Sequence, residues 1–126
     1  MDRFAATGLV FEAVLQPDRR IAVVAARQTE ARDALEAVAT AASRVDAGDL
    51  VERVRRTNGD GEISFLNGSR ILFRSARQSL RGRALDAIFV HPDVPRHVLA
   101  EDQWVKWCRE NEPCLQARHG ELLLAW

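Results

Sequence analysis

The stretch of residues 61–94 constrains the fold of this chain more than any other part of the sequence. Two short apolar runs, residues 63–66 and 70–73, flank the dipeptide Asn67-Gly68. Asn-Gly between strand-like runs is a strong hairpin signal, because both central residues of a type I′ turn need a positive φ. We therefore predict two antiparallel strands joined by a type I′ turn.

A basic loop and an apolar run follow the hairpin. Residues 85–90 are apolar except for Asp86, which is typical of a buried strand, and the run ends at His91-Pro92-Asp93. The loop before this run carries four arginines around Gly82: Arg74, Arg77, Arg81 and Arg83. We expect a functional site on this loop or at the polar end of the strand.

Composition sets broad limits on the class of protein. The 126 residues predict a single α/β domain, residues 1–126, with 47% hydrophobic and 29% charged residues. No apolar run approaches the roughly 18 residues that a membrane span needs, and the first residues show no signal-peptide pattern. Two cysteines make no disulfide framework, so we expect a cytoplasmic protein without membrane contact.

The formal net charge of zero conceals an uneven distribution. Residues 50–83 carry eight arginines and three acidic residues, a net charge of +5, whereas residues 1–49 and 84–126 carry −2 and −3. A basic middle segment can present a positive surface to phosphates or to an acidic partner.

The periodicity of the N-terminal half predicts two helices and two strands. Residues 3–16 have helical spacing that ends before Pro17, and residues 21–26 are a compact apolar run. Residues 29–43 form a second helical pattern, with Thr29 as the expected N-cap. Residues 50–56 fit a strand or a short helix, and we favour a strand.

The C-terminal part predicts one more helix and a last strand. Residues 97–111 have a helical pattern whose buried face we expect to hold Ala100, Trp104, Trp107 and Cys108. Residues 121–126 are another apolar strand. Strands separated by helices predict a three-layer α/β fold with a mainly parallel sheet, into which the hairpin is an antiparallel insertion.

This order resembles the ATPase domain of phage terminase large subunits and, more broadly, the RecA-like P-loop NTPases. Residues 21–28 (IAVVAARQ) are similar to the second strand and its polar end, and residues 63–73 (ISFLNGSRILF) to the hairpin. Residues 79–82 (SLRG) are similar to the loop that contains Arg-Gly. Residues 85–90 stand where the Walker B strand belongs, and residues 121–125 where the coupling strand belongs.

The catalytic motifs of that family do not appear in this sequence. A Walker A loop needs glycines that let backbone N–H groups hold phosphates, followed by a lysine, but the sequence lacks G-x-x-x-x-G-K-[ST] and its one lysine is Lys106. The Walker B acidic pair is replaced by His91-Pro92. We therefore expect a partial, degenerate ATPase fold that is not an enzyme, binds no cofactor and holds no metal.

The resemblance also implies an open sheet edge. In RecA-like sheets the phosphate-loop strand lies beside the coupling strand, and no strand precedes the first helix here. We expect this edge, with Leu122, Leu124 and Trp126 as interface residues, to be covered by the N-terminal segment or to pair with a second copy in a homodimer.

The arginines of the basic segment are the candidate nucleic-acid-binding residues. Arginine binds phosphates bidentately, although the same residues could equally be a solvated strand face and loop. Zinc binding is disfavoured, because the H-x5-H and C-x5-C spacings fit no compact zinc motif. The set comprises Arg53, Arg55, Arg56, Arg70, Arg74, Arg77, Arg81 and Arg83.

Two functions from different classes remain open. The first is a non-catalytic module that binds nucleic acid, with duplex DNA backbone as the favoured ligand. The second is a small phage protein that engages a host or packaging protein through the open sheet edge and the tryptophan-bearing helix. A phage-encoded protein of either kind would act in the host cell cytoplasm.

Overall fold

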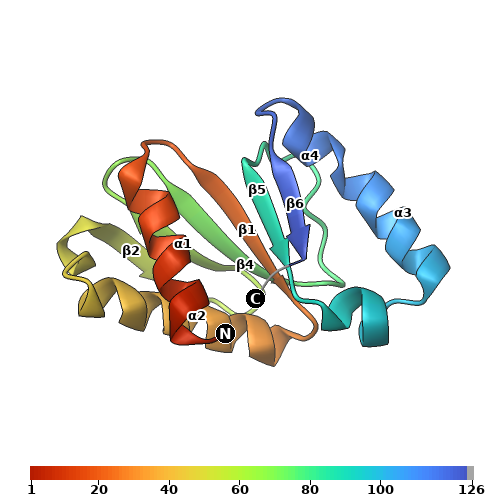
Figure 1. Cartoon of the computed structure of the whole chain (residues 1–126), viewed down its shortest axis with the longest axis horizontal. Helices are drawn as coiled ribbons and strands as arrows, with labels where there is room; N and C mark the ends of the chain where they lie inside the picture. The colour runs from red at the N-terminus through yellow and green to blue at the C-terminus, as the bar shows by residue number, and fades with distance from the viewer. Residues whose placement is uncertain (125–126) are drawn as a thin grey trace.

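The computed structural model describes residues 1–124 (Figure 1). Four α-helices, a 3₁₀ turn (Gly48–Leu50) and a π turn (Val94–Val98) accompany six strands. No helix in the described part is long and apolar enough to cross a membrane. The helices are α1 (Arg3–Leu15), α2 (Gln28–Arg44), α3 (Glu101–Asn111) and α4 (Pro113–Gln116), and the strands are β1 (Arg20–Ala25), β2 (Val51–Arg55), β3 (Gly61–Phe65), β4 (Arg70–Ser75), β5 (Ala87–Val90) and β6 (Glu121–Leu124).

The six strands form one sheet in the order β2-β3-β4-β1-β5-β6. Strands β4, β1, β5 and β6 run parallel, and β3 pairs antiparallel with both β2 and β4. The predicted mainly parallel α/β sheet with an antiparallel hairpin is confirmed. The second hairpin strand, β4, is also an inner strand of the parallel sheet, because it lies beside β1.

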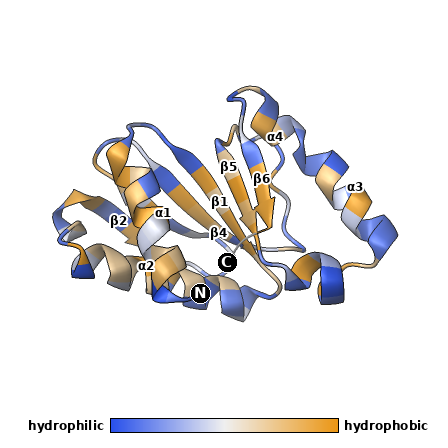
Figure 2. Cartoon of the chain, in the orientation of Figure 1, coloured by the Kyte–Doolittle hydropathy of each residue, from blue (hydrophilic) through white to orange (hydrophobic). Residues whose placement is uncertain are grey.

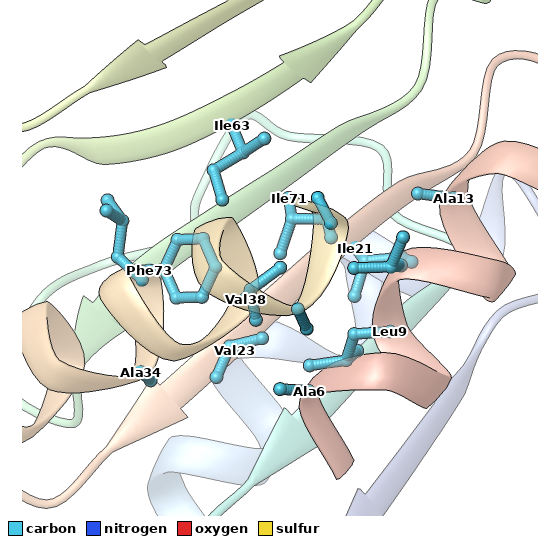
Figure 3. Close-up of a cluster of buried hydrophobic side chains, with 14 of the residues drawn as sticks. Ala6, Leu9, Ala13, Ile21, Val23, Ala34, Val38, Ile63, Ile71 and Phe73 are labelled. Carbon is cyan, nitrogen blue, oxygen red and sulfur yellow. The ribbon is translucent and has the colours of Figure 1, made fainter. Parts of the chain in front are cut away.

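Helices α1 and α2 cover one face of the sheet over β1, β3 and β4. Their small residues, such as Ala6 and Ala34, let the helices approach the strands closely (Figure 3). The strands contribute large side chains to this cluster, among them Ile63, Ile71 and Phe73. Alternate strand residues therefore form the first core.

The second core lies on the opposite face and holds the C-terminal part of the chain. The inward side chains of β1 and β5, such as Val24 and Ile88, pack there against Trp107 and Leu115. Figure 2 shows the hydrophobic strands between the two layers of helices. This second layer covers the β1-β5-β6 half of the sheet.

Helix α2 begins earlier than the sequence suggested. The N-cap residue is Arg27, in an extended conformation and without a side-chain cap hydrogen bond, so the prediction of Thr29 as N-cap was wrong. The link from β1, which ends at Ala25, is only two residues long, and Thr29 is therefore already inside the first turn.

The hairpin turn is a different type from the one predicted. Within the turn, residues 66–68, only Gly68 has a positive φ (88°), whereas a type I′ turn would need one at Asn67 too. The Gly68 N–H donates to the Phe65 carbonyl at 3.0 Å, and the Phe65 N–H donates to the Ser69 carbonyl at 2.9 Å. These bonds define a three-residue loop with a glycine bulge.

The Asn67 side chain explains this difference. Its amide nitrogen donates to the carbonyls of Ala13 (2.8 Å) and Gln16 (3.1 Å) at the end of α1, and its amide oxygen accepts from the Ser69 N–H (3.0 Å). The turn thus caps a helix whose C-cap residue, Gln16, is 51 positions earlier in the chain. The three-residue loop places the Asn67 amide within hydrogen-bond distance of the carbonyls at the end of α1.

Helix α3 begins later than predicted, at Glu101. Residues 94–98 form a separate π turn, closed by the Leu99 N–H donating to the Val94 carbonyl at 2.9 Å. Ala100 is consequently an exposed N-cap, and its predicted place on the buried face was wrong. Trp107 is buried as expected, and its indole N–H donates to the Ala76 carbonyl at 3.1 Å.

Strand β6 is the last strand of the sheet, as the open-edge prediction required. A side chain at Gly120, just before it, would place a Cβ 2.5 Å from the Leu85 carbonyl oxygen, so only glycine allows this approach to β5. The N-terminal segment forms α1 on the sheet face and does not pair with β6.

We expect Asn67→Asp to lower the free energy of unfolding by about 1–3 kcal/mol. The substitution keeps the shape of the side chain but replaces a donor with a carboxylate that faces the helix carbonyls. Chemical denaturation at neutral pH measures the difference. Asn58→Asp in an exposed turn is the matched control, and equal losses in the two variants would contradict the capping role.

Candidate functional site

The face of β2 and β3 that points away from α1 and α2 is polar. Arg53 of β2 lies opposite Ser64 of β3, which lies opposite Arg70 of β4. In the next row Arg55 is opposite Glu62. Neighbouring residues of a strand point to opposite faces. The apolar residues that alternate with these polar ones along the strands therefore point into the core on the other face.

Two adjoining hollows lie on this face and share Glu62 and Arg70. The first runs over β2 and β3, and the second, of about 490 Å³, reaches the start of β1 and the loop around Gly82. Together they form one surface, here called the basic groove. Its arginines are Arg20, Arg53, Arg55, Arg70 and Arg83.

Arg53 and Arg83 are the groove arginines most available to a ligand. Both are exposed, and neither has an ion pair within residues 1–124. Arg70 is 3.7 Å from the Glu62 carboxylate with a side chain that is 64% exposed, a loose contact that an anion can replace. Arg55 has a closer partner, Asp60 at 3.1 Å.

Arg74 is a structural residue rather than an exposed one. Its side chain is only 5% exposed and donates to the Gly61 carbonyl (2.6 Å), the Phe73 carbonyl (2.9 Å) and Asp60 (2.9 Å). Burial and then the nearby charge of Arg83 lower the pKa of the Arg74 guanidinium, which the Asp60 carboxylate opposes. Arg74 therefore ties the hairpin to the preceding turn and offers no group at the surface.

The remaining predicted arginines are not in the groove. Arg56 hydrogen-bonds Glu36 of α2 on the opposite face, and this bond lowers the pKa of the Glu36 carboxyl. Arg81 lies 3.6 Å from Glu110 of α3. Arg77 is exposed after β4 but lines neither hollow. The structure thus brings together four of the eight predicted residues.

The sequence interpretation missed Arg20 and the network that holds it. The Asp86 carboxylate accepts from the backbone N–H of Arg20 (2.8 Å) and from the Arg118 side chain (3.0 Å). Arg118 also donates to the Asp18 carbonyl at 2.6 Å. Asp86 therefore holds one wall of the groove in place. In the sequence it could have been noticed as the one acidic residue in an apolar run.

The pKa of Asp86 is lower than that of an ordinary aspartate. Burial would raise the pKa, since the side chain is only 9% exposed, but the hydrogen bonds from Arg118 and the Arg20 N–H outweigh it. The charge of Arg19, 3.7 Å away, acts in the same direction as these hydrogen bonds. The carboxylate is thus ionised in the folded protein at neutral pH.

The polar end of β5 brings a histidine and an aspartate into contact. The Asp93 N–H donates to His91 Nδ1 at 3.0 Å, and His97 lies 4.0 Å from the Asp93 carboxylate. No three His, Cys, Asp or Glu side chains between residues 1 and 124 are grouped so that they could hold a metal ion.

Cys108 is half-buried, which raises the pKa of its thiol and leaves it a poor nucleophile.

The predicted interface residues lie on the edge strand. Leu122 packs partly against the second core, and Leu124 is 52% exposed. Trp126 lies outside the described residues. Trp104 is half-buried and stacks on Trp107 with ring centroids 5.4 Å apart, so the two tryptophans support each other.

The sheet order, the two layers of helices and the hairpin define a mixed α/β fold. Among solved structures, the chain is similar to the large terminase ATPase domain of Thermus phage P74-26, with a TM-score of 0.71 and 20% sequence identity. An arginine-to-alanine mutant of that domain gives the same TM-score at 19% identity.

Each match covers 95% of this chain and 52% of the other, so the chain spans about half the length of that domain. No family model matches the sequence, and a search of curated proteins found no match. At this identity the likeness shows the fold alone.

We expect Asp86→Asn to reduce the free energy of unfolding at pH 7 by about 1–3 kcal/mol, because the half-buried Arg118 loses a charged partner. A lowered pKa in the folded state stabilises the protein above the unfolded pKa of about 3.9, and this stabilisation is lost as the pH falls through the folded pKa. The difference between wild type and variant should therefore shrink below about pH 4. Denaturation across pH measures it.

Asp33→Asn on the exposed surface of α2 is the control for that series. A gap between wild type and Asp86→Asn that widens in acid would contradict the assignment of the ionised carboxylate.

Proposed function

We propose that this chain binds the phosphate backbone of duplex nucleic acid through the basic groove and does not hydrolyse nucleotides. The observation that supports the proposal most directly is the clustering of Arg53, Arg70 and Arg83 around the two adjoining hollows of the basic groove. Guanidinium groups at such a surface can make bidentate contacts to phosphate oxygens.

The charge balance of the groove favours an extended polyanion over a small ligand. Three carboxylates, Glu52, Glu62 and Asp18, line the groove beside its five arginines. A single phosphate would meet both signs, whereas a backbone with regularly spaced phosphates can follow the exposed arginines and leave the carboxylates in water. Such binding is weak, independent of sequence and sensitive to salt.

Duplex is the better ligand than single strands, because the groove offers no stacking surface. Among residues 1–124, no aromatic residue lines either hollow. The nearest phenylalanines in sequence, Phe65 and Phe73, are buried in the core on the other face. Proteins that hold single strands without sequence preference use aromatic side chains on which bases stack.

The non-catalytic part of the proposal comes from the sequence. The chain has no Walker A motif, and its one lysine, Lys106, is on α3 and lies 3.8 Å from Glu110. At the end of β5, where the resemblance places the Walker B acids, the residues are His91 and Pro92. Neither provides a carboxylate for a magnesium ion.

Gel shifts across a salt series test the binding. For each phosphate that the protein neutralises, log affinity for duplex DNA should fall by about 0.9 per log unit of salt. Arg53→Gln combined with Arg83→Gln should weaken binding and make this slope shallower by about one for each phosphate that is no longer neutralised.

Arg32→Gln combined with Arg44→Gln is the matched control, because both residues are exposed on α2 across the sheet and carry the same charge. Equal weakening by the two double variants would show that net charge, and not the groove, governs binding.

We expect no tight, magnesium-dependent uptake of ATP in a calorimeter and no hydrolysis above a buffer blank, since no residue of the sequence replaces the phosphate loop. Saturable heat that depends on magnesium would overturn the non-catalytic assignment while leaving the groove to be tested separately.

A second candidate function is protein binding through the edge of β6, as in a phage factor that acts on a host or packaging protein. The position of β6 at the end of the sheet and the exposure of Leu124 favour it. It predicts little binding of nucleic acid at any salt concentration, and loss of partner binding when residues 122–126 are removed.

A further inference from the structure

Helix α1 carries an apolar stripe on the side that faces away from the sheet. Phe4 is 77% exposed, Phe11 43% and Leu15 76%, and Gly8 lies exposed between them. These four residues recur every three or four positions and therefore share one helix face. The opposite face, with Ala6 and Ala13 among its members, is in the core. We call the four exposed residues the α1 stripe.

The composition of α1 is unusual for a helix with one face in water. Its hydrophobic colouring in Figure 2 contrasts with that of α3, which has several hydrophilic residues. Arg3 lies over the Phe4 ring at 5.3 Å, so a cation stacks on this end of the stripe, and Glu12 is paired with Arg19. A helix that is hydrophobic on all sides is normally covered on all sides.

Nothing in residues 1–124 explains the glycine at position 8. It is in the middle of α1 with an ordinary helical backbone, and a Cβ built on it meets no atom of residues 1–124 within 4 Å apart from the adjacent backbone of the helix itself. Glycine in a helix interior is less favourable than alanine. Its usual role there is to let another surface approach the helix closely, and the described chain supplies no such surface.

We propose that the α1 stripe binds the same stripe of a second copy, with the two helices antiparallel. The stripe is complementary to itself in this arrangement alone: Phe11 of each copy faces the notch at Gly8 of the other, and Phe4 faces Leu15. In each pair the two residues lie at equal distances on either side of the same midpoint of the helix. One register of the two antiparallel helices therefore brings both pairs into contact. A two-fold axis through the midpoint of the stripe generates the contact.

The size of this contact is that of a transient interface. Buried aromatic side chains contribute roughly 150–250 Å² each, so two helices give an interface at the low end of the range for specific complexes, below about 1,200 Å². We therefore expect a dimer that exchanges reversibly with the monomer. Pairing leaves the basic groove open, because α1 and the groove are on opposite faces of the sheet.

Sedimentation equilibrium over a range of protein concentrations tests the proposal. Gly8→Leu should weaken dimerisation at least tenfold, because the new side chain fills the notch that receives Phe11. The same variant should keep or raise the thermal midpoint of the monomer, since the position is open and leucine is the better helix former. Val105→Ala, which removes an exposed apolar residue from α3, is the control and should leave the association unchanged.

A swapped variant distinguishes specific pairing of the stripe from non-specific hydrophobic association. Gly8→Phe combined with Phe11→Gly exchanges the knob and the notch, and it should restore at least part of the association that Gly8→Phe alone removes. Equal losses in the single and swapped variants would overturn the proposed register. A wild-type protein that is monomeric at every concentration, or a dimer that survives Gly8→Leu, would overturn the proposal.

Crosslinking tests the direction of the helices. In a Cys108→Ser background, a short thiol crosslinker should join Phe4→Cys to Leu15→Cys when the two proteins are mixed. Neither protein alone should crosslink as efficiently, because antiparallel pairing separates identical positions. Preferential joining of Phe4→Cys to itself would contradict the antiparallel arrangement.

Discussion

The contact between the hairpin turn and the end of α1 fixes the register of several elements at once. Asn67 caps the helix, and the Ser69 hydroxyl donates to the Gln16 carbonyl and accepts from the Arg19 N–H, each at 3.0 Å. The Arg70 N–H then donates to the Arg19 carbonyl at 2.8 Å, which starts the parallel pairing of β1 with β4. Buried backbone groups must find partners, so these bonds favour the observed register over a shifted one.

The same junction places the basic groove. Once β4 is aligned with β1, the pleat decides which side chains of the hairpin enter the core and which face the groove. Ile71 and Phe73 enter the core, and Arg70 between the turn and Ile71 faces outward. The Asp86 network holds the start of β1 at the other wall. A surface of exposed arginines is thus positioned by buried apolar residues and by one ionised carboxylate.

The two faces of the sheet serve different purposes in the functions proposed for this chain. The covered face gives the fold its first core and presents the outer side of α1, while the uncovered half of the other face presents the arginines. The likeness to a terminase ATPase domain concerns the arrangement of strands and helices and extends over about half of that domain. A fold of this kind hosts many functions, and the function therefore has to be sought in the side chains.

The sequence by itself determined the elements, their order and the class of sheet, because alternating and helical periodicities are local properties of the chain. It also located the basic segment and the edge strand. Only the tertiary structure decided the type of the hairpin turn, since the partners of the Asn67 amide are more than fifty positions away. It decided the fates of the arginines for the same reason: Arg74 is buried against Asp60, Arg56 faces α2, and Arg53 and Arg83 remain exposed. The sequence gives the positions of the charged residues, but their exposure to solvent and their ion pairs depend on contacts between distant segments.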